Sequence, residues 1–183
     1  MSFIPLGVLA ASGGGATPAF ESIATVTASG GETSLAFNSI PQTYKSLQIR
    51  FTAKDSYSGV ADFTYVPMVV NTSNSWYTHF FYGDGGSATV EYLGLCRVGV
   101  IPNSASALAN IFGSGIIDVT DYASSTNYKT FKSINGMDRN ASGGRISLIS
   151  NLRKDTSAIT SLSFTADTTW AAGTKFSLYG IKG

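Results

Sequence analysis

The segment from Ser46 to Ala53 alternates apolar and polar side chains with a period of two. Leu47, Ile49 and Phe51 fall on one side of an extended backbone, and the polar residues between them fall on the other. Successive side chains of a β-strand point to opposite faces of its sheet. The segment therefore predicts a strand of an antiparallel sheet, with one face buried and the other in contact with water.

The same period recurs along the chain. It pairs Ile146 with Leu148, Leu162 with Phe164 and Ala166, and Phe176 with Leu178 and Gly180. Less regular apolar runs cover residues 23–28, 34–37, 63–70, 76–81, 89–100, 116–119 and 128–134. Turns rich in Gly, Asn and Ser separate these runs. Ten or eleven short strands of this kind predict an all-β fold, either a sandwich or a barrel. We favour a jelly-roll-like antiparallel β-sandwich.

Pro67 lies within the run 63–70. Proline has no amide hydrogen to donate to a neighbouring strand, so we expect this strand at a sheet edge or at a β-bulge.

The first part of the chain differs from the rest, because no Lys or Arg precedes Lys45. We predict an extended arm and Gly-rich linker over residues 1–19, and the sandwich over 20–183. Three interpretations of the arm stay open: a secretory signal, a disordered tail, and a peptide that docks on a partner. A signal needs a positive start and an unbroken apolar run, whereas Pro5 and Gly7 interrupt this one. We favour docking through the apolar residues Phe3, Ile4, Pro5, Leu6, Val8 and Leu9. The stretch is also too short for a membrane span.

Charged residues make up only 13% of the chain, and the net charge is +1. Disordered chains and coiled coils are rich in charged residues, so the composition excludes both classes. Proteins that bind nucleic acid are normally basic, so this class is not expected. The solvated strand faces must therefore carry Ser and Thr in place of charged side chains.

The residues that perform most enzyme chemistry are scarce. Cys96 is the only cysteine and His79 the only histidine, so no internal disulfide and no zinc site with two histidines can form. We expect Cys96 to lie inside a strand as a small buried hydrophobe. Asp84 lies between glycines, which favours a hairpin turn over a calcium loop. We therefore expect no catalytic residues, no metal and no cofactor.

One aromatic cluster combines flat rings with polar groups, which is typical of carbohydrate sites. It comprises Trp76, Tyr77, His79, Tyr82 and Asp84. Two interpretations stay open, a buried core cluster or a surface that contacts glycans. On an alternating strand, Tyr77 and His79 share one face and Trp76 takes the other.

Three segments carry a resemblance: residues 3–13, residues 40–50 and residues 172–182. Together they resemble short β-sandwich virion structural proteins of tailed bacteriophages; the middle of the chain is not matched. The resemblance implies a non-enzymatic homotrimer, assembled in the host cytoplasm into a virion and held by contacts with other virion proteins. A tail-fibre or baseplate appendage is the first expectation. The alternatives are a capsid decoration protein, or a carbohydrate-binding module that contacts host surface polysaccharide.

Overall fold

A computed structural model describes residues 19–59, 63–72, 75–104, 110–139 and 143–183. All regular structure in this part of the chain is β-strand, which confirms the predicted all-β fold. The strands are β1 (Phe20–Thr27), β2 (Ser34–Phe37), β3 (Ser46–Ala53), β4 (Thr64–Val70), β5 (Trp76–Gly83), β6 (Ala88–Leu93), β7 (Arg97–Ile101), β8 (Gly113–Thr120), β9 (Lys129–Asp138), β10 (Gly144–Arg153), β11 (Leu162–Thr165) and β12 (Lys175–Ile181). The predicted docking residues Phe3, Ile4, Pro5, Leu6, Val8 and Leu9 lie outside the described residues.

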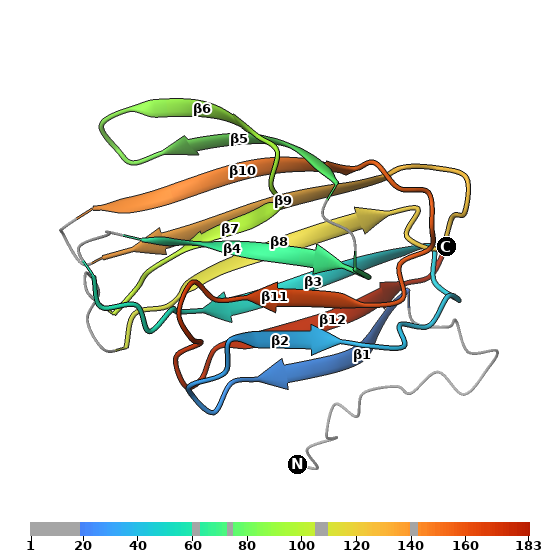
Figure 1. Ribbon diagram of the computed structural model, residues 1–183, viewed down its shortest axis with the longest axis horizontal. Helices are drawn as coiled ribbons and strands as arrows, with labels where there is room; N and C mark the ends of the chain where they lie inside the picture. Colours follow the sequence, from blue (N-terminus) through green and yellow to red (C-terminus); the bar gives the residue numbers. More distant parts are fainter. Residues whose placement is uncertain (1–18, 60–62, 73–74, 105–109, 140–142) are drawn as a thin grey trace, which may run out of the picture.

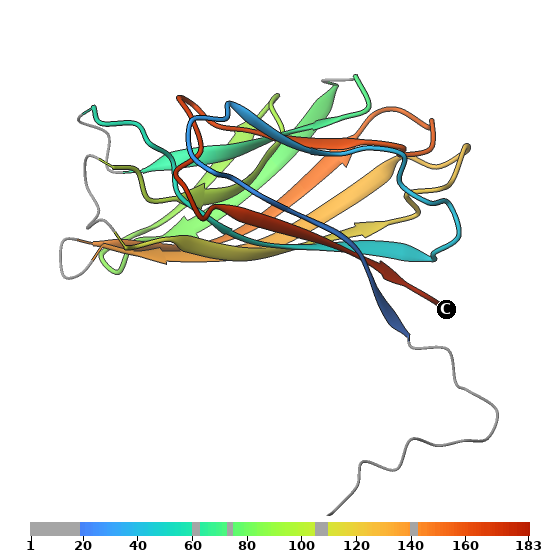
Figure 2. The ribbon, with the colours of Figure 1, turned by 90° about the horizontal axis from the view of Figure 1, so that it is seen from below.

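The strands form two antiparallel sheets packed face to face (Figures 1 and 2). The larger sheet has the order β1-β12-β3-β8-β9-β10-β5-β6, and the smaller has the order β2-β11-β4-β7. In Figure 1 the smaller sheet lies in front, and β5 and β6 extend past its upper edge.

The pairing of the strands is that of a jelly roll with two added hairpins. β1 pairs with β12, β2 with β11, β3 with β8, and β4 with β7. These nested pairs fold one long antiparallel ribbon into two layers, as in a jelly roll. The hairpins β5–β6 and β9–β10 interrupt the nested order, and both extend the larger sheet beyond β8.

The core lies between the sheets and uses the predicted apolar faces. Leu47, Ile49 and Phe51 of β3 are buried, as are Phe164 of β11 and Phe176 of β12. The apolar alternation of these strands is thereby confirmed, because each sheet turns one face toward the other.

β4 lies between β11 and β7, and its register shifts between Tyr65 and Pro67. The expected bulge is therefore present. Next to it, the Met68 amide donates a hydrogen bond of 3.4 Å to the Cys96 carbonyl oxygen. Cys96 is buried but lies between β6 and β7, so its predicted place inside a strand was wrong.

β10 reverses the pattern that its apolar residues predict. Ile146 and Leu148 are 68% and 58% exposed, whereas Ser147 and Asn151 are buried. Hydrogen bonds offset the cost of removing the Asn151 side chain from water. The Asn151 amide donates to the Arg97 carbonyl oxygen at 3.0 Å and its side-chain oxygen accepts from the Thr78 hydroxyl at 2.5 Å.

Candidate interaction face

The outer face of the larger sheet carries a continuous row of apolar side chains, one from each of five neighbouring strands. Ile116 of β8 pairs with Ile134 of β9, which pairs with Leu148 of β10. Leu148 pairs in turn with Phe81 of β5, and Phe81 pairs with Val90 of β6. Directly paired residues on one face of an antiparallel sheet hold their Cβ atoms about 5 Å apart. We call these five residues the apolar row.

Three further apolar residues lie beside the row on the same outer face, namely Ile146, Tyr77 and Tyr92. With the apolar row they form what we call the interaction face. Exposure of its eight residues ranges from 37% for Ile116 to 71% for Val90. At about 200 Å² for a fully exposed large side chain, these fractions amount to roughly 900 Å². Apolar patches on monomers rarely exceed about 600 Å².

The interaction face lies mainly on the two hairpins that are added to the jelly roll, β5–β6 and β9–β10. Four of the five residues of the apolar row come from the hairpins β5–β6 and β9–β10. Gln48, Arg50 and Thr52 occupy the outward positions of β3 at the other flank. The Arg50 guanidinium lies 5.3 Å from the ring centroids of both Phe20 and Tyr179. The added hairpins therefore supply the apolar surface, and the jelly roll supports it.

Two hollows flank the apolar row. One, of about 410 Å³, is lined by His79, Phe81, Val90, Lys132, Leu148 and Ser150 among others. The other, of about 500 Å³, lies over β3, β8, β9 and β10 and includes Ile116, Ile134, Gly136 and Ile146 in its lining. Gly136 pairs directly with Ile146 and leaves space beside it. The row is thus a ridge between depressions that foreign side chains could fill.

Exposed aromatic rings lie on β5 and β6, at the end of the apolar row formed by Phe81 and Val90. The Tyr77 and Tyr92 rings stack with centroids 5.8 Å apart, and the His79 ring meets Tyr92 edge-on at 5.1 Å. The Lys154 Nζ lies 3.9 Å from the centroid of the Tyr77 ring. We call Tyr77, His79 and Tyr92 the aromatic cluster. Tyr92 was not predicted, although alternation along residues 89–93 could have indicated its outward side chain.

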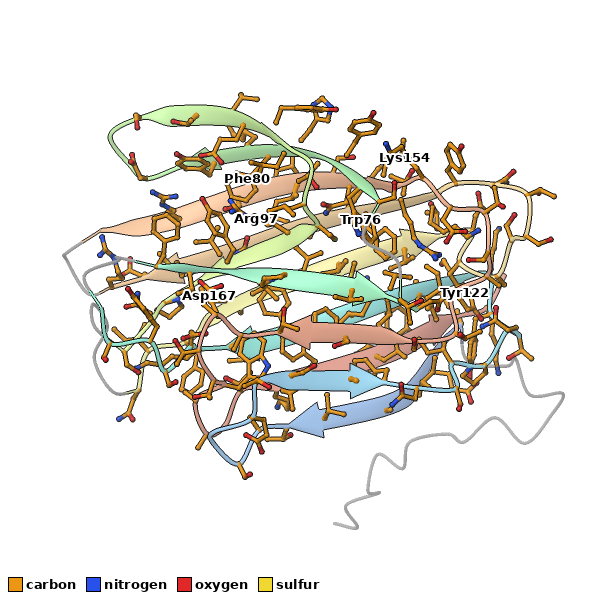
Figure 3. The ribbon with its side chains drawn as sticks, viewed as in Figure 1. Trp76, Phe80, Arg97, Tyr122, Lys154 and Asp167 are labelled. Atoms are coloured by element: carbon orange, nitrogen blue, oxygen red, sulfur yellow. The ribbon has the colours of Figure 1, made fainter. Side chains whose placement is uncertain are left out.

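The five residues of the predicted carbohydrate cluster do not share one surface. Tyr77 and His79 face outward, whereas Trp76 is 3% exposed and meets Phe131 edge-on with centroids 5.2 Å apart. Tyr82 also faces inward, where its ring lies 5.2 Å from that of Phe80 (Figure 3 labels Trp76 and Phe80). The core interpretation thus holds for Trp76.

Asp84 has a local role in the turn between β5 and β6. Its Oδ1 accepts hydrogen bonds from the backbone amides of Ser87 at 2.8 Å and Gly86 at 3.0 Å. These bonds lower the pKa of the Asp84 carboxyl. Gly85 has a φ of +90°, which glycine adopts without strain. Asp84 therefore closes the hairpin, as the Gly-rich sequence around it indicates.

A separate hollow of about 390 Å³ lies beside β4 and β7 (Figure 3 labels Arg97, Asp167 and Trp76). The Arg97 guanidinium carbon lies 3.5 Å from the centroid of the Tyr65 ring. Desolvation, and secondarily the charge of Asp55, raises the pKa of Asp167. The hollow joins one cation, one carboxyl group and aromatic rings, but it lies apart from the interaction face.

Two buried cations stabilise loops at one end of the sandwich. Lys129 donates hydrogen bonds to the carbonyl oxygens of Ser124 and Thr156, both at 2.5 Å, and of Asn127 at 2.8 Å. Arg153 pairs with Lys129 across β10 and β9, and its guanidinium binds the Asp155 carboxylate at 2.6 Å. Burial lowers the pKa of both cations. These contacts are structural, since each charge is engaged with a loop.

Within the described residues, no group of three or more His, Cys, Asp and Glu side chains could hold a metal ion. The same part of the chain contains no helix long and apolar enough to cross a membrane. Burial raises the pKa of the Cys96 thiol well above its ordinary value, which disfavours the thiolate.

Comparison with protein-family models, with curated proteins and with solved structures finds no match for this chain.

Proposed function

We propose that the chain is a non-enzymatic structural protein of a tailed-bacteriophage virion. The sandwich is displayed as part of a trimeric tail-fibre or baseplate appendage, and the N-terminal arm docks it on other virion proteins. The observation that carries the proposal is the interaction face, which leaves roughly 900 Å² of apolar surface on a rigid sheet. A surface of that extent marks a site of association.

Three further features support a role in an assembly. The jelly roll is an architecture that viral capsid domains use. The low charge of the chain suits contacts based on apolar area, which salt screens little. The sequence segments that resemble phage virion proteins include β12 and the first half of β3, which pair with each other in the larger sheet. A capsid decoration protein would need the same features and remains the alternative location.

Examination of purified particles tests the proposal. We expect the protein in virions purified by density gradient, with its density at the tail in averaged particle images; density on the capsid would favour the alternative location. Removing residues 2–12 leaves every described strand intact, so the shortened protein should fold but should not enter particles. Absence of the full-length protein from purified virions would overturn the proposal, and normal incorporation of the shortened protein would overturn the docking role of the arm.

The aromatic cluster favours a second function, the binding of host surface polysaccharide, at a copy whose Tyr77 and Tyr92 rings no neighbouring subunit covers. Tyr77 and Tyr92 present adjacent exposed rings, and His79 and Lys154 lie beside them with polar groups. Flat rings next to hydrogen-bonding groups suit the apolar faces and hydroxyls of sugars. Glycan-array binding that Tyr92→Ala abolishes and Tyr128→Ala preserves would support this function. Tyr128 is a matched control because it is 54% exposed outside the cluster.

A further inference from the structure

We infer that a second copy of this chain covers the interaction face, including the apolar row, in the assembled protein. The inference rests on the proposed function, because it assigns a surface to the proposed contact between subunits. It predicts more than an oligomer. The residues of the apolar row, four of which come from the two added hairpins, contact the neighbouring copy, and the flank formed by β1, β12 and β3 does not.

The area of the interaction face fits a protein partner. A stable protein interface buries about 800 Å² on each partner, and the eight residues of the interaction face together expose roughly 900 Å². A small ligand would occupy a concave pocket. The apolar row is instead a ridge, because its five side chains stand in register across neighbouring strands between two hollows. Side chains of an opposing protein surface could fill both hollows at once.

The chemistry along the row also favours protein over polysaccharide. Ile116, Ile134, Leu148 and Val90 are aliphatic and offer no donors or acceptors to sugar hydroxyls. Polar residues lie in the next register position, where Asp118 pairs with Lys132 and Lys132 pairs with Ser150. The Gln48 amide donates to Asp118 at 2.8 Å. An apolar centre with a polar margin is the usual anatomy of a protein interface.

The charge of the chain favours a copy of itself as that partner. With a net charge of +1 and only 13% charged residues, copies approach without strong repulsion. Within the polar margin, Lys132 lies opposite a residue of the other charge, Asp118.

The mass of the protein in solution tests the inference. We propose sedimentation of the full-length chain and of Leu148→Lys over a range of micromolar concentrations. Leu148 lies at the centre of the apolar row and is 58% exposed, so lysine is accommodated in the isolated subunit. In an interface its charge would be buried without a partner, which should weaken association at least about a hundredfold. Ala36→Lys is the control, because it adds the same charge at an exposed position of β2 in the other sheet.

The expected result is an oligomeric wild-type protein, an oligomeric Ala36→Lys variant and a monomeric Leu148→Lys variant with an unchanged circular dichroism spectrum. Ile134→Lys should behave like Leu148→Lys, and it provides the same test if one variant fails to fold. A monomeric wild type would overturn the inference, and so would unchanged association of both row variants. A wild-type dimer lost in Leu148→Lys would support the inference and contradict the proposed trimer. Particle incorporation is measured separately, so the proposed function can fail while the inference stands.

Discussion

The rings of Phe164 and Phe176 stack with centroids 4.2 Å apart and an interplanar angle of 13°. Phe164 belongs to β11 in the smaller sheet and Phe176 to β12 in the larger, so this stack joins the two layers. Phe176 also meets Phe51 at 5.6 Å and Trp170 at 5.5 Å. The four rings form the aromatic centre of the core.

Phe176→Ala should therefore destabilise the sandwich strongly. Removal of a fully buried phenylalanine costs about 3–5 kcal/mol, because apolar contacts are lost and a cavity remains. Urea denaturation would measure the decrease in the unfolding free energy. Tyr128→Ala, at an exposed ring, should change it by less than about 0.5 kcal/mol. Equal effects of the two substitutions would contradict the assigned core.

Lys129→Met should destabilise the protein. Removing a buried charge is favourable by itself, but here it also removes hydrogen bonds to the loops. Three loop carbonyl oxygens accept hydrogen bonds from the Lys129 ammonium and would lose that partner. We expect a loss of about 3 kcal/mol in thermal or urea unfolding. Lys132→Met is the matched control, because Lys132 lies on the same strand with its side chain exposed. A neutral Lys129→Met variant would show that the loops do not depend on these bonds.

Glu32 should link the stability of the β1–β2 loop to acid pH. Its carboxylate accepts hydrogen bonds from the Ser29 hydroxyl and from the amides of Ser29 and Gly30, which lowers its pKa to about 2. A group whose pKa is lower in the folded state stabilises that state above its unfolded pKa of 4.5, and the contribution is lost as pH falls toward 2. Wild type should thus exceed Glu32→Gln in stability above pH 4.5, and the difference should vanish near pH 2. A pKa near 4.5 in a carboxyl NMR titration of the wild type would refute the assignment.

Trp76→Ala should destabilise the protein strongly, and Tyr92→Ala should leave its stability nearly unchanged. Trp76 is buried against Phe131, so its truncation should lower the unfolding free energy by about 3–5 kcal/mol. Tyr92 is 60% exposed, so Tyr92→Ala should leave stability within about 1 kcal/mol of the wild type. Thermal unfolding of both variants measures this contrast. A folded Trp76→Ala protein of wild-type stability would contradict the core position of Trp76.

Cys96 should react slowly with thiol reagents in the native protein. It is 6% exposed, and burial raises the pKa of its thiol, so both access and thiolate formation are disfavoured. Labelling with a chromogenic disulfide should be at least about a hundredfold faster in denaturant. Rapid stoichiometric labelling of the folded chain would show that the turn between β6 and β7 opens readily.

Much of the fold could be predicted from the sequence because the information is local. Alternation along Ser46–Ala53 is sufficient to predict β3 with its correct buried face. Pro67 predicts either an edge strand or a bulge, and the structure has the bulge in a strand between two others. The same reasoning failed at Ile146 and Leu148, because it assumes that the more apolar face of a strand is the buried one. In β10 the polar face is the buried one, and Asn151 on that face hydrogen-bonds with Thr78 and Arg97.

The sequence by itself determined the element type, the turns and the alternation of faces, since these depend on neighbouring residues. Only the tertiary structure decided that Ile116, Ile134, Leu148, Phe81 and Val90 form one row. Two groups of consecutive strands, β8–β10 and β5–β6, supply these residues, and the long-range pairing of β10 with β5 joins the two groups. A shift of one residue in any pairing would move a strand's side chains to the opposite face. The candidate interaction face is thus a product of strand order and register, which local sequence does not encode.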